Sequence, residues 1–487
     1  MSPEGKSWIQ SRTGQANALA EFSSFEPPWQ YHHPIRPTSQ IPTIPLKMPK
    51  QTVVLNALQQ YKQNVLSLAF PVVEVSAFEK TIAEAYNFEG PGNSIQLCSQ
   101  ACVLAFLALT SLMVPQTSDF MESLLASESY STSARILLPL MLKEASIEKL
   151  QTLVMLSIHD VFTGNLQEAC FTNALATRIT FFMGANRCNG SGNGNPMQNR
   201  AVYPAPYLHA RNLFWLVYIL DKELCIRTGH PPSVNDDCCD LDLPEEYMKQ
   251  FYEGLKDIQV PSQVHFPFDL RLAMIKSKAH SQLYSANAAR KESSEILQDI
   301  RVLDQELEIW RRSLPHCLRP TMNFKENQHV RHVIDMRIVI LQLAYYSCMS
   351  YIHEASCKFQ LSPEGELLVT EGVNSSLTLA VEASRSLLLY YRLMQPLLEN
   401  QSFWAMLYYP VSALMTILKG IILRPERQQS HDDLEFLEKG NYWKNLGDLH
   451  SDIPEGVQDH LQRLDNFVTD MSRLGKIVIT ETHHTQE

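Results

Sequence analysis

Cysteine is absent from the first 97 residues of this chain. The first cysteine is Cys98, and no two cysteines anywhere in the 487 residues have the C-x2-C spacing. Because a structural zinc site needs four ligands at workable spacing, we predict no zinc cluster and no other metal or cofactor site in this chain. Cys98 and Cys102 are four residues apart in an apolar stretch, which favours core packing over metal binding.

Basic charge is scarce as well. The formal net charge is −11 at pH 7, and the first fifty residues contain only five Lys and Arg. Binding to duplex DNA relies on clustered Lys and Arg that neutralise phosphates. We therefore expect this chain by itself to bind DNA weakly and without sequence preference.

Long apolar runs are also missing. The longest, 101–114 and 338–352, fall short of the ~20 residues that a membrane-spanning helix needs. The N-terminal sequence has no apolar core of the kind that a signal peptide requires. We predict that both runs form buried helices, and that the ten cysteines are reduced thiols in an intracellular compartment.

Helical periodicity is what the sequence does contain. Apolar residues recur at helical spacing from Val54 through Leu58, Tyr61, Val65 and Leu68, and no sustained strand-like alternation occurs. Hydrophobic residues at 45% and charged residues at 19% are typical of folded globular proteins. We predict an all-α fold with a single large helical domain of about a dozen or more helices.

The domain boundaries follow from composition. Residues 1–50 are polar and rich in proline, so we predict a flexible N-terminal segment. The helical domain is expected to cover 51–475, with a polar tail at 476–487. Inter-helix loops are expected at 90–92, 189–196, 261–267, 363–372 and 424–433, the second of them disordered.

Segment 210–244 is the most informative stretch. Its first half is apolar nearly all round at helical spacing, which predicts a buried helix over 211–227. Gly229 is a plausible stop for that helix, and an acidic loop follows. Asp221 lies on the buried helix, and a carboxylate there requires partners. We predict that these are backbone N–H groups of the following loop or a basic side chain.

This order of features resembles the middle homology region of the fungal-specific transcription factor family. The family pattern runs Arg, Phe-Trp, Asp-Lys/Arg, Gly-Arg-Pro, an Asp-rich loop and Leu-Pro. The matching residues are Arg211, Phe214, Trp215, Asp221, Lys222, Gly229, Pro231, Asp236, Asp237, Asp240 and Pro244. His230 departs from the pattern, because the family usually has Arg there. Segments 68–86, 147–187 and 307–315 also resemble the family, so the resemblance covers roughly residues 61–315.

The resemblance implies a regulatory domain of a nuclear transcription regulator that has no catalytic activity. Such proteins often control metabolic or secondary-metabolite genes, and respond to partner regulators or small-molecule inducers. Family members usually carry a six-cysteine binuclear zinc cluster that binds DNA. Here DNA binding is expected to come from DNA-bound partners or from an exon missing in the gene model, and no membrane association is implied. The matching residues are expected to have structural or regulatory roles.

Two other functions stay open at this stage. A protein derived from such a regulator could sequester a metabolite or another regulator. Asp236, Asp237 and Asp240 also spell the DDxxD motif of terpene synthases, in which carboxylates on one helix face hold Mg²⁺. Neighbouring prolines disfavour a helix at that point, so we regard this enzyme as a remote alternative.

The segment from Ile296 to Trp310 could form a short dimer seam, since Ile300, Leu303 and Leu307 continue its heptad-like spacing. It covers only about two heptads, fewer than a coiled coil requires. Packing of this helix on the core of its own domain is the favoured interpretation.

Overall fold

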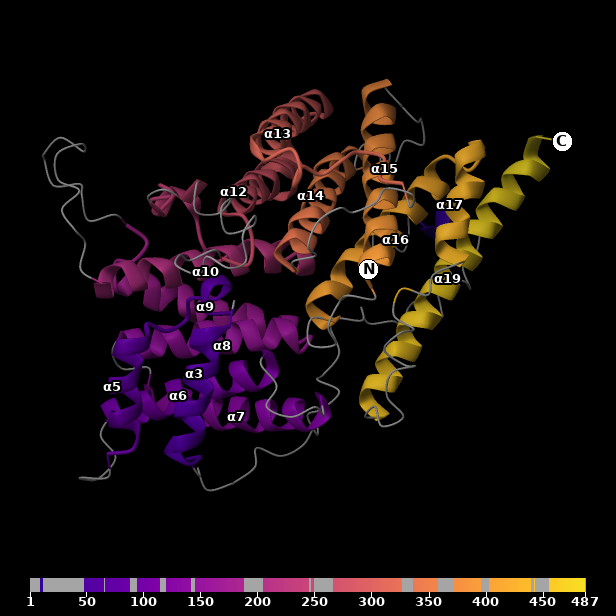
Figure 1. The fold of residues 1–487 in the computed structure, drawn as a ribbon. Helices are drawn as coiled ribbons and strands as arrows, with labels where there is room; N and C mark the ends of the chain where they lie inside the picture. The colour runs from indigo at the N-terminus through magenta and orange to yellow at the C-terminus, as the bar shows by residue number, and fades with distance from the viewer. Residues whose placement is uncertain are drawn as a thin grey trace, which may run out of the picture. The chain divides into compact units, whose positions relative to one another are not determined.

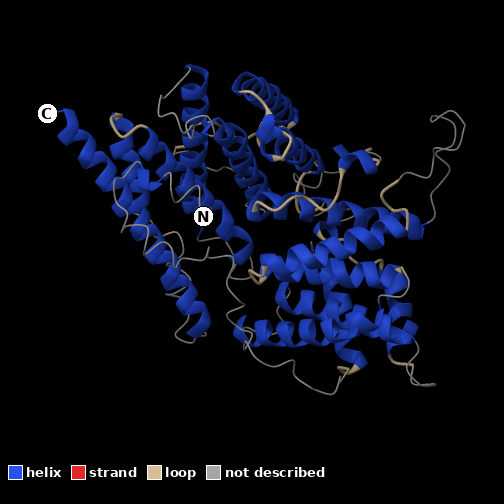
Figure 2. Ribbon diagram, turned by 180° about the vertical axis from the view of Figure 1, so that it is seen from behind, coloured by secondary structure: helices blue, strands red, loops and turns tan. Residues whose placement is uncertain are grey.

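The computed structural model describes residues 9–11, 48–64, 66–87, 94–113, 120–141, 145–187, 205–244, 247–248, 266–325, 336–357, 371–395, 403–438, 442 and 455–486. These residues form more than a dozen α-helices, and none of them lies in a β-strand (Figure 2). The all-α prediction is therefore confirmed. The predicted flexible segment 1–50 and the loops at 90–92 and 189–196 lie wholly or almost wholly outside the described residues.

The chain divides into two compact units, for which the sequence had marked no boundary. We call the described residues of Thr38–Ala273 the N-terminal unit and those of Met1–Pro37 and Met274–Glu487 the C-terminal unit. Helix α12 (Leu270–Ala279) lies at the division. Figure 1 labels the helices of both units.

The N-terminal unit is built around a helix that is apolar on all sides. α6 (Ser94–Met113) buries Cys98 and Cys102, as the core-packing interpretation predicts. It packs against α5 (Val75–Ala85), α7 (Phe120–Met141) and α8 (Ile147–Phe162), while α9 (Leu166–Phe182) covers α8 (Figure 1). The side chains of Glu74 and Ser146 cap α5 and α8 by accepting hydrogen bonds from backbone N–H groups of their first turns.

The predicted helix through Val54 and Leu68 is interrupted. α3 (Gln51–Gln63) buries Val54, Leu58 and Tyr61, but it ends before Asn64, whose backbone is extended at φ −98° and ψ 149°. A separate short helix, α4 (Leu66–Ala69), follows. The interruption has a local cause, because asparagine side chains compete with the helical backbone for hydrogen bonds and favour helix ends.

The C-terminal unit is a second group of packed helices. α14 (Met336–Glu354) contacts α13 (Ser293–Ser313), α15 (Glu371–Met394) and α16 (Phe403–Leu423). α16 also contacts α17 (Gln428–Glu438) and α19 (Glu455–Gln486). The expected loop 424–433 is thus shorter than predicted, because α17 begins at Gln428. α19 likewise continues through 476–486, where Val478 and Ile479 are buried.

The apolar face of α13 packs within this unit. Ile296, Ile300, Leu303, Leu307 and Trp310 are all buried. The Trp310 ring stacks on Tyr345 of α14, with centroids 6.1 Å apart. The interpretation that this helix packs on its own core is confirmed.

Two described helices are long and apolar enough to cross a membrane by length and composition. They are Ser94–Met113 and Trp404–Leu423, and 78% of each apolar window is buried. The burial of the predicted 101–114 helix is confirmed, and so is that of 338–352 in α14. The sequence reasoning had not singled out the apolar segment of α16. Both candidate helices have the burial of core helices.

Candidate functional site

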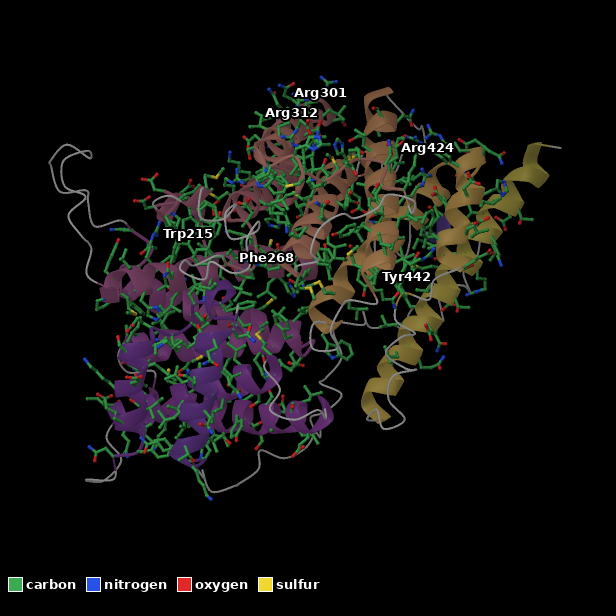
Figure 3. The ribbon with its side chains drawn as sticks, viewed as in Figure 1. Trp215, Phe268, Arg301, Arg312, Arg424 and Tyr442 are labelled. Carbon is green, nitrogen blue, oxygen red and sulfur yellow. The ribbon has the colours of Figure 1, made fainter. Side chains whose placement is uncertain are left out.

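The most informative sequence segment forms one long buried helix and a loop that folds back on it. α10 (Ala205–Thr228) packs on α8 and α9. Phe214, Trp215 and Tyr218 are fully buried in it, as predicted (Figure 3 labels Trp215). The helix ends where expected, at Gly229, whose φ of 73° is a left-handed conformation that glycine adopts without strain.

Asp221 joins the helix to the loop. Its Oδ1 accepts a hydrogen bond from the Ser233 N–H at 2.7 Å, and its Oδ2 accepts one from the Val234 N–H at 3.0 Å. Lys222 Nζ lies 3.3 Å from Oδ2. These are the partners that the sequence predicted. Burial raises the pKa of the Asp221 carboxyl, while Lys222 and the two N–H groups act in the opposite direction. Asp221 therefore contributes to the fold mainly by satisfying these three donors, of which Lys222 and Val234 are buried residues.

Lys222 is the second connection between helix and loop. Only 2% of its surface is exposed, which is rare for an ammonium group. Its Nζ donates to the Val234 carbonyl at 2.6 Å, forms an ion pair with Asp236 at 3.1 Å, and lies 4.8 Å from the centre of the Tyr218 ring. The Tyr218 hydroxyl also donates to Asp236, at 3.2 Å. The buried ammonium is thus surrounded by acceptors.

Arg211 makes the third connection, about three helical turns before Asp221 on α10. Its guanidinium donates to the Ala185 carbonyl at 3.1 Å and to the Asp240 carbonyl. It also lies over the rings of Phe214 and Trp215, at 4.4 and 5.2 Å from their centroids. Arg211 therefore links α10 both to the acidic loop and to the segment that follows α9. We call Arg211, Asp221, Lys222 and their loop partners the α10 lock.

Residues that sequence reasoning missed complete the lock. Asn186 donates through Nδ2 to the Cys238 carbonyl at 2.7 Å, and its own carbonyl accepts the Asp240 N–H at 2.8 Å. The preceding Gly184 has a φ of 69° and turns the chain toward the loop. Gly184 is the one sequence signal for this turn, because hydrogen bonds to backbone carbonyls cannot be predicted from a pattern of side chains.

The three carboxylates of the DDxxD sequence do not share a helical face. Asp236 and Asp237 lie in a single 3₁₀ turn (Asp236–Cys238) capped by Asn235. Asp236 points to Lys222 and Tyr218, Asp237 is exposed, and the Asp240 carboxylate accepts the Asp242 N–H at 3.0 Å. Among the described residues, no group of three or more His, Cys, Asp or Glu could hold a metal ion. The arrangement lacks the convergent carboxylates that a Mg²⁺-diphosphate site needs.

The remaining motif residues lie outside the lock. Pro231 and His230 are exposed immediately after the helix, so the replacement of the family's usual Arg by His falls on a solvated position. The Pro244 carbonyl accepts the Tyr247 N–H at 3.0 Å, which turns the chain as it leaves the loop.

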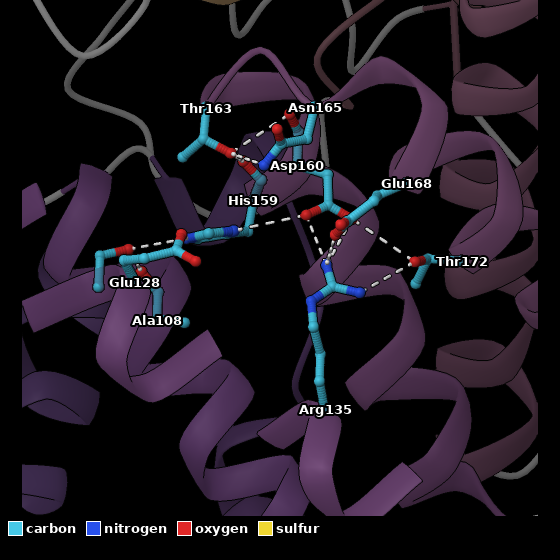
Figure 4. Close-up of polar contacts among 10 residues, drawn as sticks. Ala108, Glu128, Arg135, His159, Asp160, Thr163, Asn165, Glu168 and Thr172 are labelled. Atoms are coloured by element: carbon cyan, nitrogen blue, oxygen red, sulfur yellow. Dashed lines mark hydrogen bonds and ion pairs between the residues drawn. The ribbon is translucent and has the colours of Figure 1, made fainter. Parts of the chain in front are cut away.

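A second buried polar network ties together α6, α7, α8 and α9 (Figure 4). Arg135 of α7 donates to both oxygens of Asp160 at 2.5 and 2.6 Å, and to Thr172 of α9 at 3.4 Å. His159 Nε2 lies 3.0 Å from Ser127 Oγ, which donates to the Ala108 carbonyl at 2.6 Å. The Arg135 charge lowers the pKa of the Asp160 carboxyl against the opposing effect of burial.

Ser127, His159 and Asp160 are the residue types of a hydrolase triad, but their geometry is that of a structural network. All three are completely buried, so no substrate reaches the hydroxyl. His159 Nδ1 lies 3.8 Å from Asp160 Oδ1, too long for the orienting hydrogen bond of a triad. The sequence could not bring Ser127 and His159 together, because they are 32 positions apart on different helices.

The N-terminal unit also contains a buried neutral histidine. His209 on α10 lies 2.9 Å from Gln151 of α8, joined through His209 Nε2 and Gln151 Nε2. Burial lowers the pKa of His209 to about 4, while the Glu74 carboxylate opposes the shift. The imidazole therefore packs in the core in its uncharged form at neutral pH.

These features define an all-helical domain whose most distinctive site is a buried charge network between a central helix and an acidic loop. Residues 58–312 match the model of the fungal-specific transcription factor domain, so the chain belongs to that family. The α10 lock lies inside the matched region.

The relatives that the chain matches are transcription regulators. An ABC-transporter-regulating transcription factor of Aspergillus fumigatus is 26% identical over 498 residues, which cover 98% of this chain and 53% of that protein. A fusaridione A cluster transcription factor of Fusarium heterosporum is 21% identical, over 75% of this chain and 66% of its own length. A dehydrocurvularin biosynthesis regulator of Aspergillus terreus is 22% identical, over 67% of this chain and 40% of its own length.

This chain spans about half the length of the Aspergillus fumigatus regulator that it matches. No solved structure matches it significantly.

Proposed function

We propose that this chain is the regulatory domain of a fungal transcription regulator that controls metabolic or secondary-metabolite genes. The observation that carries the proposal is the family match over residues 58–312, which includes the complete α10 lock. The names of the relatives support the gene class, since they include regulators of an ABC transporter and of two biosynthetic clusters or pathways. A nuclear location follows from the same proposal.

We infer that the domain acts through protein partners or small-molecule inducers, and not by catalysis. Lys222 and Tyr218 occupy the Asp236 carboxylate, a backbone N–H group occupies that of Asp240, and Asp237 is exposed, so the loop offers no converging acid and base. The net charge of −11 favours partner regulators over direct contact with DNA phosphates. The α10 lock would hold the central helix and its loop in one arrangement that such a partner recognises.

A tethering experiment tests this proposal. The full chain is fused to a heterologous DNA-binding domain and expressed in a fungal cell with the matching reporter gene. We expect reporter transcription to differ from that of the DNA-binding domain alone, and Asp221→Ala to reduce the difference. Asp237→Ala is the matched control, because Asp237 is an exposed carboxylate of the same loop. Reporter output equal to that of the DNA-binding domain alone in all growth conditions would contradict the proposal.

The purified chain gives an independent test of how it reaches DNA. Fluorescence anisotropy with duplex DNA at physiological salt should show weak binding that does not depend on sequence. A nanomolar, sequence-selective complex would show that the chain reads DNA itself. A protein that only sequesters another regulator would instead lower that regulator's activity when expressed without tethering.

A further inference from the structure

The C-terminal unit contains a small pocket lined by arginines. It has a volume of about 30 Å³ and is bounded by α15, α16 and α17. Thr378, Arg385, Arg424, Arg427, Gln429 and Asp433 are among the residues that line it. The pocket lies outside the segment 58–312 that matches the family domain. Its volume is sufficient for a group larger than one water molecule.

Arg424 is the buried part of this pocket. It directly follows α16, between α15 and α17 (Figure 3), and only 7% of its surface is exposed. Its Nη1 donates to the Thr378 hydroxyl at 3.2 Å, and its Nη2 has no hydrogen-bond acceptor among the described residues. Burying a guanidinium without a charged partner is unfavourable. The guanidinium of Arg424 is therefore only partly satisfied by its hydrogen bond to Thr378.

A second guanidinium lies against the same hydroxyl. Arg427, which is exposed at the rim, donates through Nη1 to Thr378 Oγ1, also at 3.2 Å. The Thr378 hydroxyl donates its own hydrogen bond to the Asn374 carbonyl at 2.9 Å, so it can only accept from the arginines. One neutral oxygen therefore accepts from two cations, which repel each other. Burial lowers the pKa of Arg424, and the neighbouring charge of Arg427 lowers it further.

The other charges of the pocket do not compensate this pair. Arg385 and Asp433 neutralise each other through two hydrogen bonds of 2.5 and 2.7 Å. Three arginines and one aspartate line the pocket, so the formal charge of its lining is +2. Glu426, the nearest carboxylate on the chain segment of Arg424, is exposed and opposes the pKa shift only in part.

The start of α17 adds to the positive potential. Gln429 and Ser430 line the pocket in the first turn of this eleven-residue helix, and no acidic residue occupies that turn. Backbone N–H groups at a helix N-terminus favour anions. On the opposite wall, Gly420 has no Cβ, and a Cβ there would lie 2.7 Å from Val381 Cγ2. The glycine thus allows α15 and α16 to approach closely at the pocket.

We propose that this pocket binds the oxyanion group, a phosphate or carboxylate, of a small molecule. Arg427 meets the anion at the rim, and Arg424 supplies the buried charge. Nη groups of the two arginines give the planar, multidentate recognition that such groups require, and the positive end of the α17 dipole adds to the attraction. The binding proposal stands independently of the transcriptional role, whereas any control of transcription by the anion rests on the proposed function.

Titration of the purified full chain with inorganic phosphate and with malonate tests the proposal. Isothermal calorimetry in chloride buffer is expected to show one site for at least one of the two probes, and the preferred probe identifies the oxyanion. Binding also raises the melting temperature by mass action. Arg427→Gln, at an exposed position, should weaken this binding by about tenfold without altering the helical circular dichroism. Arg424→Gln should weaken it at least as much.

Arg312→Gln is the matched control, because Arg312 is an exposed arginine of the same unit that pairs with Glu308. It should leave the phosphate or malonate response unchanged. The proposal is overturned if neither probe binds, or if Arg312→Gln and Arg427→Gln reduce binding equally. It is also overturned if Arg427→Gln folds normally and keeps the full response. None of these readouts depends on transcription, so a negative result would overturn the anion site without contradicting the proposed function.

Discussion

Arg211 in the N-terminal unit and Arg424 in the C-terminal unit are buried to the same extent, at 7% exposure each. Arg211 donates to two backbone carbonyls and lies over two aromatic rings. Arg424 shares one hydroxyl oxygen with a second arginine, and its Nη2 has no acceptor among the described residues. The two arginines are therefore equally buried, but the guanidinium of Arg211 has more interaction partners than that of Arg424.

The difference separates two uses of a buried charge. When the fold supplies every acceptor, as in the α10 lock, the charge fixes one arrangement of helix and loop, and removing a partner is destabilising. Where the fold leaves a donor without an acceptor beside a pocket, as at Arg424, the anion that we propose compensates the charge.

Asp221→Ala should have the largest effect, because it converts a closed network into an open one. It leaves Lys222 with one carboxylate fewer and strips the Ser233 and Val234 N–H groups of their acceptor. We expect the free energy of unfolding to fall by about 2–4 kcal/mol. Urea denaturation followed by circular dichroism measures it. Asp237→Ala, which removes an exposed carboxylate of the same loop, should change stability by less than about 0.5 kcal/mol.

Acid should lower the stability of the N-terminal unit, because a protonated His209 is unfavourable in its core. The pKa of His209 is lowered to about 4 in the folded state from 6.5. Below pH 6.5 the unfolded chain therefore takes up a proton that the folded chain does not. Stability is present above that pH and is lost as the pH falls toward 4, by up to about 3 kcal/mol.

Comparison of the wild type with His209→Gln isolates this contribution from that of other groups. The stability difference between the two proteins should shift in favour of the variant as the pH falls from 7 to 4. His230→Gln, at an exposed position, controls for the removal of one histidine. A His209→Gln difference that stays constant over this range would mean that the imidazole is not held neutral in the core.

Gly229→Ala should have the smallest effect. A Cβ at Gly229 meets no atom within 4 Å, so only the left-handed φ of 73° opposes the alanine. We expect a loss of about 1 kcal/mol, measured by urea denaturation. Gly372→Ala near the start of α15 is the control. Its Cβ would make ordinary contacts at 3.9 Å, so it should be neutral or slightly stabilising. A neutral Gly229→Ala would show that the turn relaxes without releasing the lock.

The sequence predicted α10, its glycine stop and the partners of Asp221, because these features follow from local periodicity and from the need of a buried carboxylate for donors. It did not predict contacts between distant helices. Arg135 and Asp160 are 25 positions apart, and Thr378 and Arg424 are 46 apart. Neither pair belongs to a local pattern, since helix packing alone brings the members together. The break at Asn64 was missed because apolar spacing continues across it.

Hydrogen exchange at two backbone amides tests whether Asp221 locks the acidic loop to α10. The Ser233 and Val234 N–H groups donate to the two oxygens of Asp221. Both should therefore exchange slowly in the wild type and lose protection in Asp221→Ala. The His230 N–H, which donates to the Thr228 hydroxyl outside the lock, should exchange equally in both proteins. Rapid exchange of Ser233 and Val234 in the wild type would show that Asp221 does not hold the loop on α10.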